Sequence, residues 1–137
     1  MTTVEESIIQ QDKKIPLLLK VISTIIMLEG ILGFLFFSII LIYQLFNPDF
    51  ISNWDYGHYS GSFLNVILII YAIVHFGLVI SAYYLLKLDK KGIYIVLLSI
   101  TILLAASYLL HNQINWLGLM TGVFVLILLS YYVKSFK

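Results

Sequence analysis

The chain of 137 residues contains neither cysteine nor arginine. Without cysteine it can form no disulfide, no thiolate metal site and no cysteine nucleophile, and its redox compartment stays undetermined. Without arginine it lacks the side chain that usually clamps phosphate and carboxylate groups in a bidentate way. The HExxH, G-x-S-x-G and phosphate-binding glycine-loop motifs are also missing. We therefore predict no catalytic residue and no cofactor, and we favour a protein without enzymatic activity over an enzyme.

Charged residues are scarce as well. They make up 11% of the chain against about 25% in ordinary soluble domains, and hydrophobic residues make up 61% against about 45–50%. The mean hydropathy is +1.02, and long stretches have no polar face that could meet water. These stretches indicate that the chain is surrounded by the lipid bilayer. The small net charge of +1 argues against a nucleic-acid partner.

Four apolar runs stand out, at about 21–46, 63–86, 93–110 and 116–133. A bilayer core of about 30 Å requires roughly 20 helical residues, so the last two runs are just long enough and the first should tilt or protrude. Backbone polar groups in hydrocarbon must pair within their own segment, which favours helices. We predict an all-α integral membrane protein, with a four-transmembrane-helix bundle of two helical hairpins over 17–137.

The lysines predict how the runs are oriented. Three lysines precede the first run, three separate the second from the third, and two follow the fourth, whereas the other two connections contain none. Basic residues gather in cytoplasmic loops, so this pattern predicts a multi-pass protein of the cell membrane with both termini in the cytoplasm. The residues concerned are Lys13, Lys14, Lys20, Lys87, Lys90, Lys91, Lys134 and Lys137.

Residues 1–16 form the predicted cytoplasmic N-terminal segment. Its mixed charge and the lack of a small-residue cleavage site do not fit a signal peptide. Thr2 or Thr3 has capping-box spacing to the glutamates that follow, and apolar residues recur on one helical face. We interpret this segment as a short interfacial helix before Pro16, although a loose segment fits the same residues.

Glu29 and His75 are ionisable residues inside predicted spans. Glu29 lies about 13 Å of helix from Lys20, and His75 about 18 Å from Lys87, so both fall near the middle of the bilayer. A carboxylate in hydrocarbon must find a partner or stay protonated. Either the two residues hydrogen-bond across a helix interface, or they form a proton or cation relay or ligate a head group or metal, or they do not meet.

Small residues mark candidate packing faces, because they let a neighbouring backbone approach closely in lipid. On a helical wheel Gly30 and Gly33 lie on the same side of the first span as the glutamate. Gly77 and Ser81 lie on the face of the second span opposite the histidine. The second span therefore has two packing faces, and we expect it inside the bundle.

Gly118 and Gly122 form a GxxxG motif in the fourth span. Such a motif packs helices closely, either within a bundle or against another subunit. The short 112–115 connection forces the third and fourth spans to be neighbours, and Ala105 and Ala106 offer a small surface there. We favour packing within the chain.

The connection 47–62 and the end of the third span carry weak candidate metal ligands. Carboxylate and imidazole groups together suit a divalent transition metal. A histidine pair at helical spacing is missing, however, so we favour an aromatic loop on the head groups and predict no metal. The candidates are Asp49, Asp55, His58 and His111.

These features leave three functions open. The first is an accessory or structural subunit of a larger membrane complex, for example of respiratory or oxygenase type, because the chain offers mainly helix surface to partner subunits. The second is a small oligomeric transporter or proton-coupled carrier that uses Glu29 and His75. The third is a membrane enzyme that acts on lipid.

Overall fold

The computed structural model describes residues 15–47, 50, 61–133 and 136, and this part of the chain contains four α-helices and no strand. The helices are α2 (Leu17–Phe46), α3 (Gly61–Leu86), α4 (Lys91–His111) and α5 (Trp116–Tyr131). The prediction of an all-α chain with four helices is confirmed. The interfacial helix predicted within 1–16 falls on positions 1–14, outside the described residues.

Helix length separates α5 from the others. The helices α2, α3 and α4 contain 30, 26 and 21 residues and are long and apolar enough to cross a membrane. The chain is therefore a small multi-pass membrane protein. The helix α5 contains 16 residues and ends at Tyr131 rather than at 133, so it extends about 24 Å. A fourth crossing over 116–133 stays a prediction.

The α4–α5 connection is tight because asparagine is suited to both of its ends. Asn112 adopts the left-handed conformation with φ of 50° and ends α4, while its N–H donates to the Tyr108 carbonyl at 2.8 Å. Asparagine tolerates this conformation better than most residues. Asn115 then caps α5, because its Oδ1 accepts a hydrogen bond from the Gly118 N–H at 2.9 Å. The two helices consequently pack as a hairpin.

The α3–α4 turn is closed by hydrogen bonds of Asp89. The Asp89 N–H donates to the Tyr84 carbonyl at 3.0 Å, and Asp89 Oδ1 accepts from the Lys91 N–H at 2.9 Å. A Cβ on Gly92 would lie 2.8 Å from the backbone nitrogen of Leu85, so only glycine allows α4 to start this close to α3.

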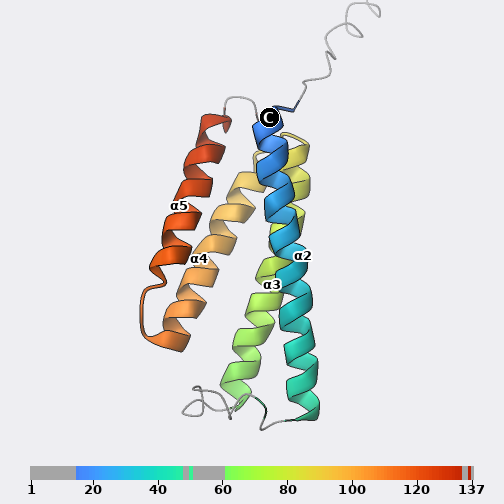
Figure 1. Cartoon of the computed structure of the whole chain (residues 1–137), viewed down its shortest axis with the longest axis vertical. Helices are drawn as coiled ribbons and strands as arrows, with labels where there is room; N and C mark the ends of the chain where they lie inside the picture. Colours follow the sequence, from blue (N-terminus) through green and yellow to red (C-terminus); the bar gives the residue numbers. More distant parts are fainter. Residues whose placement is uncertain (1–14, 48–49, 51–60, 134–135, 137) are drawn as a thin grey trace, which may run out of the picture.

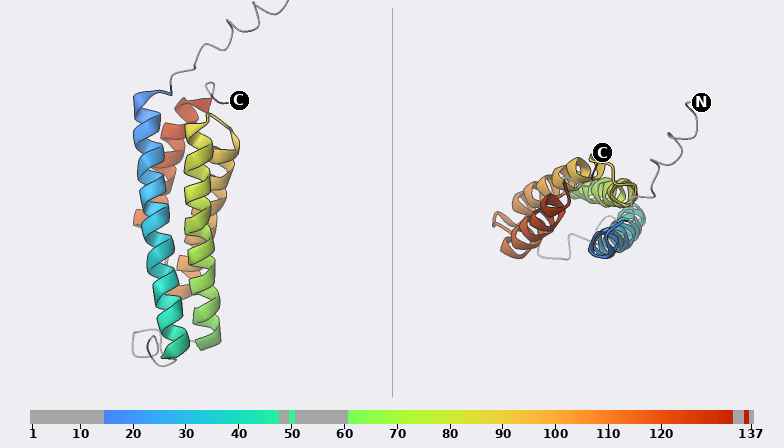
Figure 2. Two further views of the ribbon diagram at one scale, coloured as in Figure 1. Left: turned by 90° about the vertical axis from the view of Figure 1, so that its right-hand side faces the viewer. Right: turned by 90° about the horizontal axis from the view of Figure 1, so that it is seen from above.

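The helices pack in chain order and form an arc. The helix α3 packs between α2 and α4, and α5 packs against α4. Seen from above, the arc is open between α2 and α5 (Figure 2). The predicted bundle is therefore an open one, in which the first and last helices do not close into a ring.

The main core joins all four helices at one end of the bundle, measured along the helix axes. Leu19 of α2, Leu85 of α3, Val96 of α4 and Leu129 of α5 are almost fully buried there. Because successive helices run antiparallel, the same end carries Lys20 and the α3–α4 turn with its lysines (Figure 1). A smaller apolar cluster around Leu64 and Leu68 of α3 connects this helix with α2 and with Leu110 of α4 at the other end. Between these two clusters α2 and α3 stay in close contact, and a cavity lies between this pair and the other two helices.

Candidate functional site

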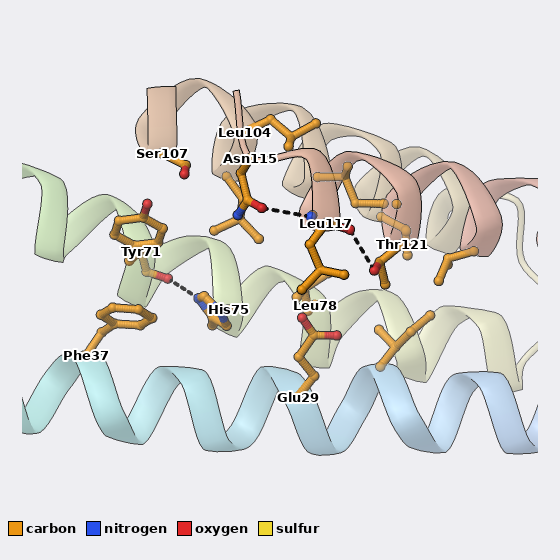
Figure 3. A pocket seen from close by; sticks show the side chains of 17 residues that line it. Glu29, Phe37, Tyr71, His75, Leu78, Leu104, Ser107, Asn115, Leu117 and Thr121 are labelled. Atoms are coloured by element: carbon orange, nitrogen blue, oxygen red, sulfur yellow. Dashed lines mark hydrogen bonds between the residues drawn. The ribbon is translucent and has the colours of Figure 1, made fainter. Parts of the chain in front are cut away.

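A cavity of about 400 Å³ lies between the helices, with residues of all four in its lining (Figure 3). Most of the lining is apolar, including Leu78, Val96 and Leu104. The polar side chains of the lining are Glu29, Tyr71, His75, Ser107, Asn115 and Thr121. An apolar cavity with a few polar groups is the usual form of a small-molecule site.

His75 is fixed on α3 by its own helix. Its Nδ1 lies 2.7 Å from the Tyr71 carbonyl oxygen. A carbonyl only accepts, so Nδ1 carries the proton and donates it to that oxygen. The imidazole is 8% exposed and its centroid lies 5.1 Å from that of the Phe37 ring. The Phe37 ring in turn stacks on Tyr71 at 4.7 Å, so an aromatic layer between α2 and α3 holds the imidazole in place.

Two glycines of α2 make room for His75. A Cβ on Gly33 would lie 1.9 Å from Cδ2 and 2.6 Å from Nε2 of the imidazole, so this edge of the ring faces the glycine. A Cβ on Gly30 would lie 2.8 Å from the His75 carbonyl oxygen. The histidine thus fills a depression in α2, and the side chain of any residue larger than glycine at position 30 or 33 would occupy the same space. Its first role in this structure is to pack α3 against α2.

Glu29 is the one carboxylate that lines the cavity in the described part of the chain. It is exposed, and its side chain points from α2 into the cavity beside Leu78 and Leu117 (Figure 3). Among the described residues no hydrogen bond or ion pair involves it. The nearby Thr121 hydroxyl donates to the Leu117 carbonyl at 2.8 Å, and Asn115 caps α5. These bonds use the hydroxyl proton of Thr121 and the Oδ1 atom of Asn115.

The structure brings Glu29 and His75 to one cavity without a direct bond between them. The imidazole packs at the level of Gly33, one helical turn or about 6 Å along α2 from Glu29. No hydrogen bond or ion pair joins the two residues in the described structure. Of the three interpretations, the hydrogen-bonded pair has no support in this geometry.

The other small residues fall in two interfaces. Gly77 and the buried Ser81 lie on α3, and a Cβ on Gly77 would lie 3.5 Å from Ser99 of α4. Gly122 is packed against Ile100 of α4, since its Cβ would lie 2.7 Å from that side chain. The nearest neighbours of a Cβ on Gly118 would be side-chain atoms of Asn115, at 3.0–3.4 Å. The close α4–α5 contact of the GxxxG motif is therefore made by its second glycine.

The candidate metal ligands are largely beyond what the structure describes. Asp49, Asp55 and His58 lie outside the described residues, and His111 is exposed at the end of α4. Within the described ranges there is no group of three or more histidine or acidic side chains that could hold a metal ion.

The cavity itself and Phe37 were missed by the sequence analysis. Phe37 follows Gly33 by four residues and Glu29 by eight, so a helical wheel places all three on one side of α2. That spacing was available as a signal. No signal in the sequence indicated that α5 contributes to the lining, because that contribution depends on how far the helices separate.

Comparisons with protein-family models, with curated proteins and with solved structures give no match for this chain.

Replacing Gly33 with alanine should destabilise the protein by about 1–3 kcal/mol, because the new methyl group would overlap the imidazole of His75. The free energy of unfolding in mild detergent measures this cost. Gly77→Ala is the matched control, since its Cβ would have only ordinary contacts. In a His75→Ala background the Gly33→Ala cost should shrink, with a coupling of about 0.5–3 kcal/mol. Equal costs in both backgrounds would contradict this packing.

Proposed function

We propose that this small multi-pass membrane protein is an accessory subunit of a larger membrane complex, whose partner helix covers the opening between α2 and α5. The observation that carries the proposal is the open arc, because consecutive helices pack together while the first and last leave the cavity uncovered. Helices in lipid associate by close packing and interhelical hydrogen bonds. An uncovered concave side that exposes an acid is a surface suited to another helix.

Apolar residues at the opening support the same proposal. Leu117 of α5 is 79% exposed although it lines the cavity. The helix α2 exposes apolar side chains along its whole length, from Leu17 to Phe46. Lipid can cover such surfaces, but a lipid chain does not supply a partner for Glu29 at this depth. A polar side chain on a covering helix could hydrogen-bond the carboxylate.

The absence of cysteine allows a direct test of the docking side. A single cysteine at Leu117, labelled with a photoreactive maleimide in native membranes, should give one cross-linked product of defined mass that contains a different polypeptide. Ile73→Cys is the matched control, because Ile73 is 64% exposed but is not part of the cavity lining. Equal cross-linking from both positions, or migration of the untreated protein as a lone small species in blue-native electrophoresis, would contradict the proposal.

We also propose that α5 is a fourth membrane crossing and that both termini are cytoplasmic. The support is the lysine distribution, together with the antiparallel order of the helices. Reporters fused before Met1 and after Lys137 should both be active only on the cytoplasmic side. Activity on opposite sides would contradict the fourth crossing, and activity of both outside would contradict the orientation.

A proton-coupled carrier is the second candidate, favoured by the location of Glu29 in a cavity that reaches all four helices. The other ionisable lining groups are Tyr71 and His75 of α3, and the lining residues of α4 and α5 include none. An intramembrane acid that faces a cavity is typical of proton and ion pathways.

If Glu29 lies on a proton pathway through this cavity, proteoliposomes that contain the protein should dissipate a pH gradient faster than empty vesicles do. Glu29→Gln should return the rate to that of empty vesicles, because the amide cannot take up a proton. Asp89→Asn, which removes a carboxylate in the α3–α4 turn, should behave as the unaltered chain. A wild-type rate equal to that of empty vesicles would eliminate the proton relay.

A further inference from the structure

We infer that the cavity is a binding site for an amphiphile with a cationic nitrogen, in which Glu29 is the counter-ion and the apolar lining receives the tail. The inference goes beyond the accessory role, since a partner helix would cover the opening without filling the cavity. It deepens the carrier proposal by naming a ligand class, but it concerns binding alone and does not require transport.

The unpaired state of Glu29 is the first step. It has no hydrogen bond or ion pair among the described residues, and its side chain points into a largely apolar space (Figure 3). A carboxylate in such surroundings is stabilised by a hydrogen-bonded cation far more than by neutral groups. The imidazole of His75 does not serve, because its Nδ1–H is donated to Tyr71 and its other edge faces Gly33.

Among the described residues, the four helices do not supply the cation. Lys20 is the nearest lysine in α2 and lies nine residues, or about 13 Å, before Glu29. The remaining lysines lie outside the four helices or at the first residue of α4, and there is no arginine. The helices of a second copy have the same distribution, so they also offer no lysine or arginine at this depth. A cation that pairs with Glu29 would therefore come from another molecule.

The shape of the site favours an amphiphile over a bare ion. The volume of about 400 Å³ falls within the range of about 300–1,000 Å³ that is usual for small-molecule sites. Apolar side chains such as Val96, Ile100 and Leu104 line the space on the α4 side, where they can receive an alkyl chain. In the isolated chain, the opening between α2 and α5 gives such a ligand access from the bilayer. An anionic amphiphile is disfavoured, because its head would meet the carboxylate.

Dodecylammonium is a suitable probe for this site. The full chain, purified into nanodiscs of phosphatidylcholine, should retain one dodecylammonium when it is released for native mass spectrometry, and empty nanodiscs give the background. Dodecanol, which has the same tail and no charge, should bind much more weakly. Glu29→Gln should lower the affinity for dodecylammonium by about 30-fold, as expected when the charged partner of the ammonium group is lost from an apolar site.

Three further variants separate charge from folding and from volume. Glu29→Asp keeps the charge and should retain most of the binding, whereas Asp89→Asn loses an equal charge outside the cavity and should bind as the unaltered chain does. Leu104→Trp should block binding by filling the cavity while Glu29 is unchanged. Because these are all measured on the isolated chain, the result is independent of whether a partner subunit or a transport activity exists.

Equal binding of dodecanol and dodecylammonium would overturn the inference, and so would unchanged dodecylammonium binding in either Glu29→Gln or Leu104→Trp. If Glu29→Gln does not fold, Glu29→Asp and Leu104→Trp decide the matter between them: binding that survives the first and is lost in the second supports the site. Adding phosphatidylethanolamine to the nanodiscs distinguishes two sources of the ammonium group. Competition indicates a lipid head group, and no competition indicates a free amine.

Discussion

The close contact between α2 and α3 at Gly30, Gly33 and His75 is the constraint on which the rest of the structure depends. The two glycines let the backbones approach, and the imidazole fills the space that their missing side chains leave. The hydrogen bond from Nδ1 to the Tyr71 carbonyl prevents the ring from turning away. This contact sets the register of the two helices and thereby places Glu29 beside Leu78, at the edge of the cavity.

The cavity follows from unequal packing along the arc. Leucines of α2, α3 and α5 bring the helices together near the lysine-bearing end, and the Asn112–Asn115 connection keeps α5 against α4 at the other. Only Gly122 and Leu129 of α5 are buried. A helix with so few buried residues is held by its connection to α4, by the approach of Gly122 to Ile100 and by Leu129 in the main core, so the width of the opening depends on how α5 sits on α4.

The number and type of the helices could be predicted from the sequence, because lipid demands long apolar segments whose backbones bond internally. The wheel positions of Glu29, Gly30 and Gly33 also identified the side of α2 that faces α3 and the cavity. The relative position of Glu29 and His75 was harder to predict. Their depths were estimated separately from the nearest lysines, whereas the observed register is set by the contact of Gly30 with the His75 carbonyl. The cavity depends on the separation of four helices, which no single segment encodes. The end of α5 at Tyr131 could not be predicted either, because the apolar sequence continues to Val133.

The unequal lengths of the first and last helices have a consequence for the surrounding lipid. The helix α2 extends about 45 Å and α5 about 24 Å, against a hydrocarbon thickness of about 30 Å. As a fourth crossing, α5 would be too short for the bilayer around it while α2 would be too long, so the hydrophobic mismatch has opposite signs on the two flanks of the opening. Lipid chains would be compressed on one flank and extended or tilted on the other. The protein would then rest most favourably where membrane thickness changes, at the border between a thinner and a thicker domain.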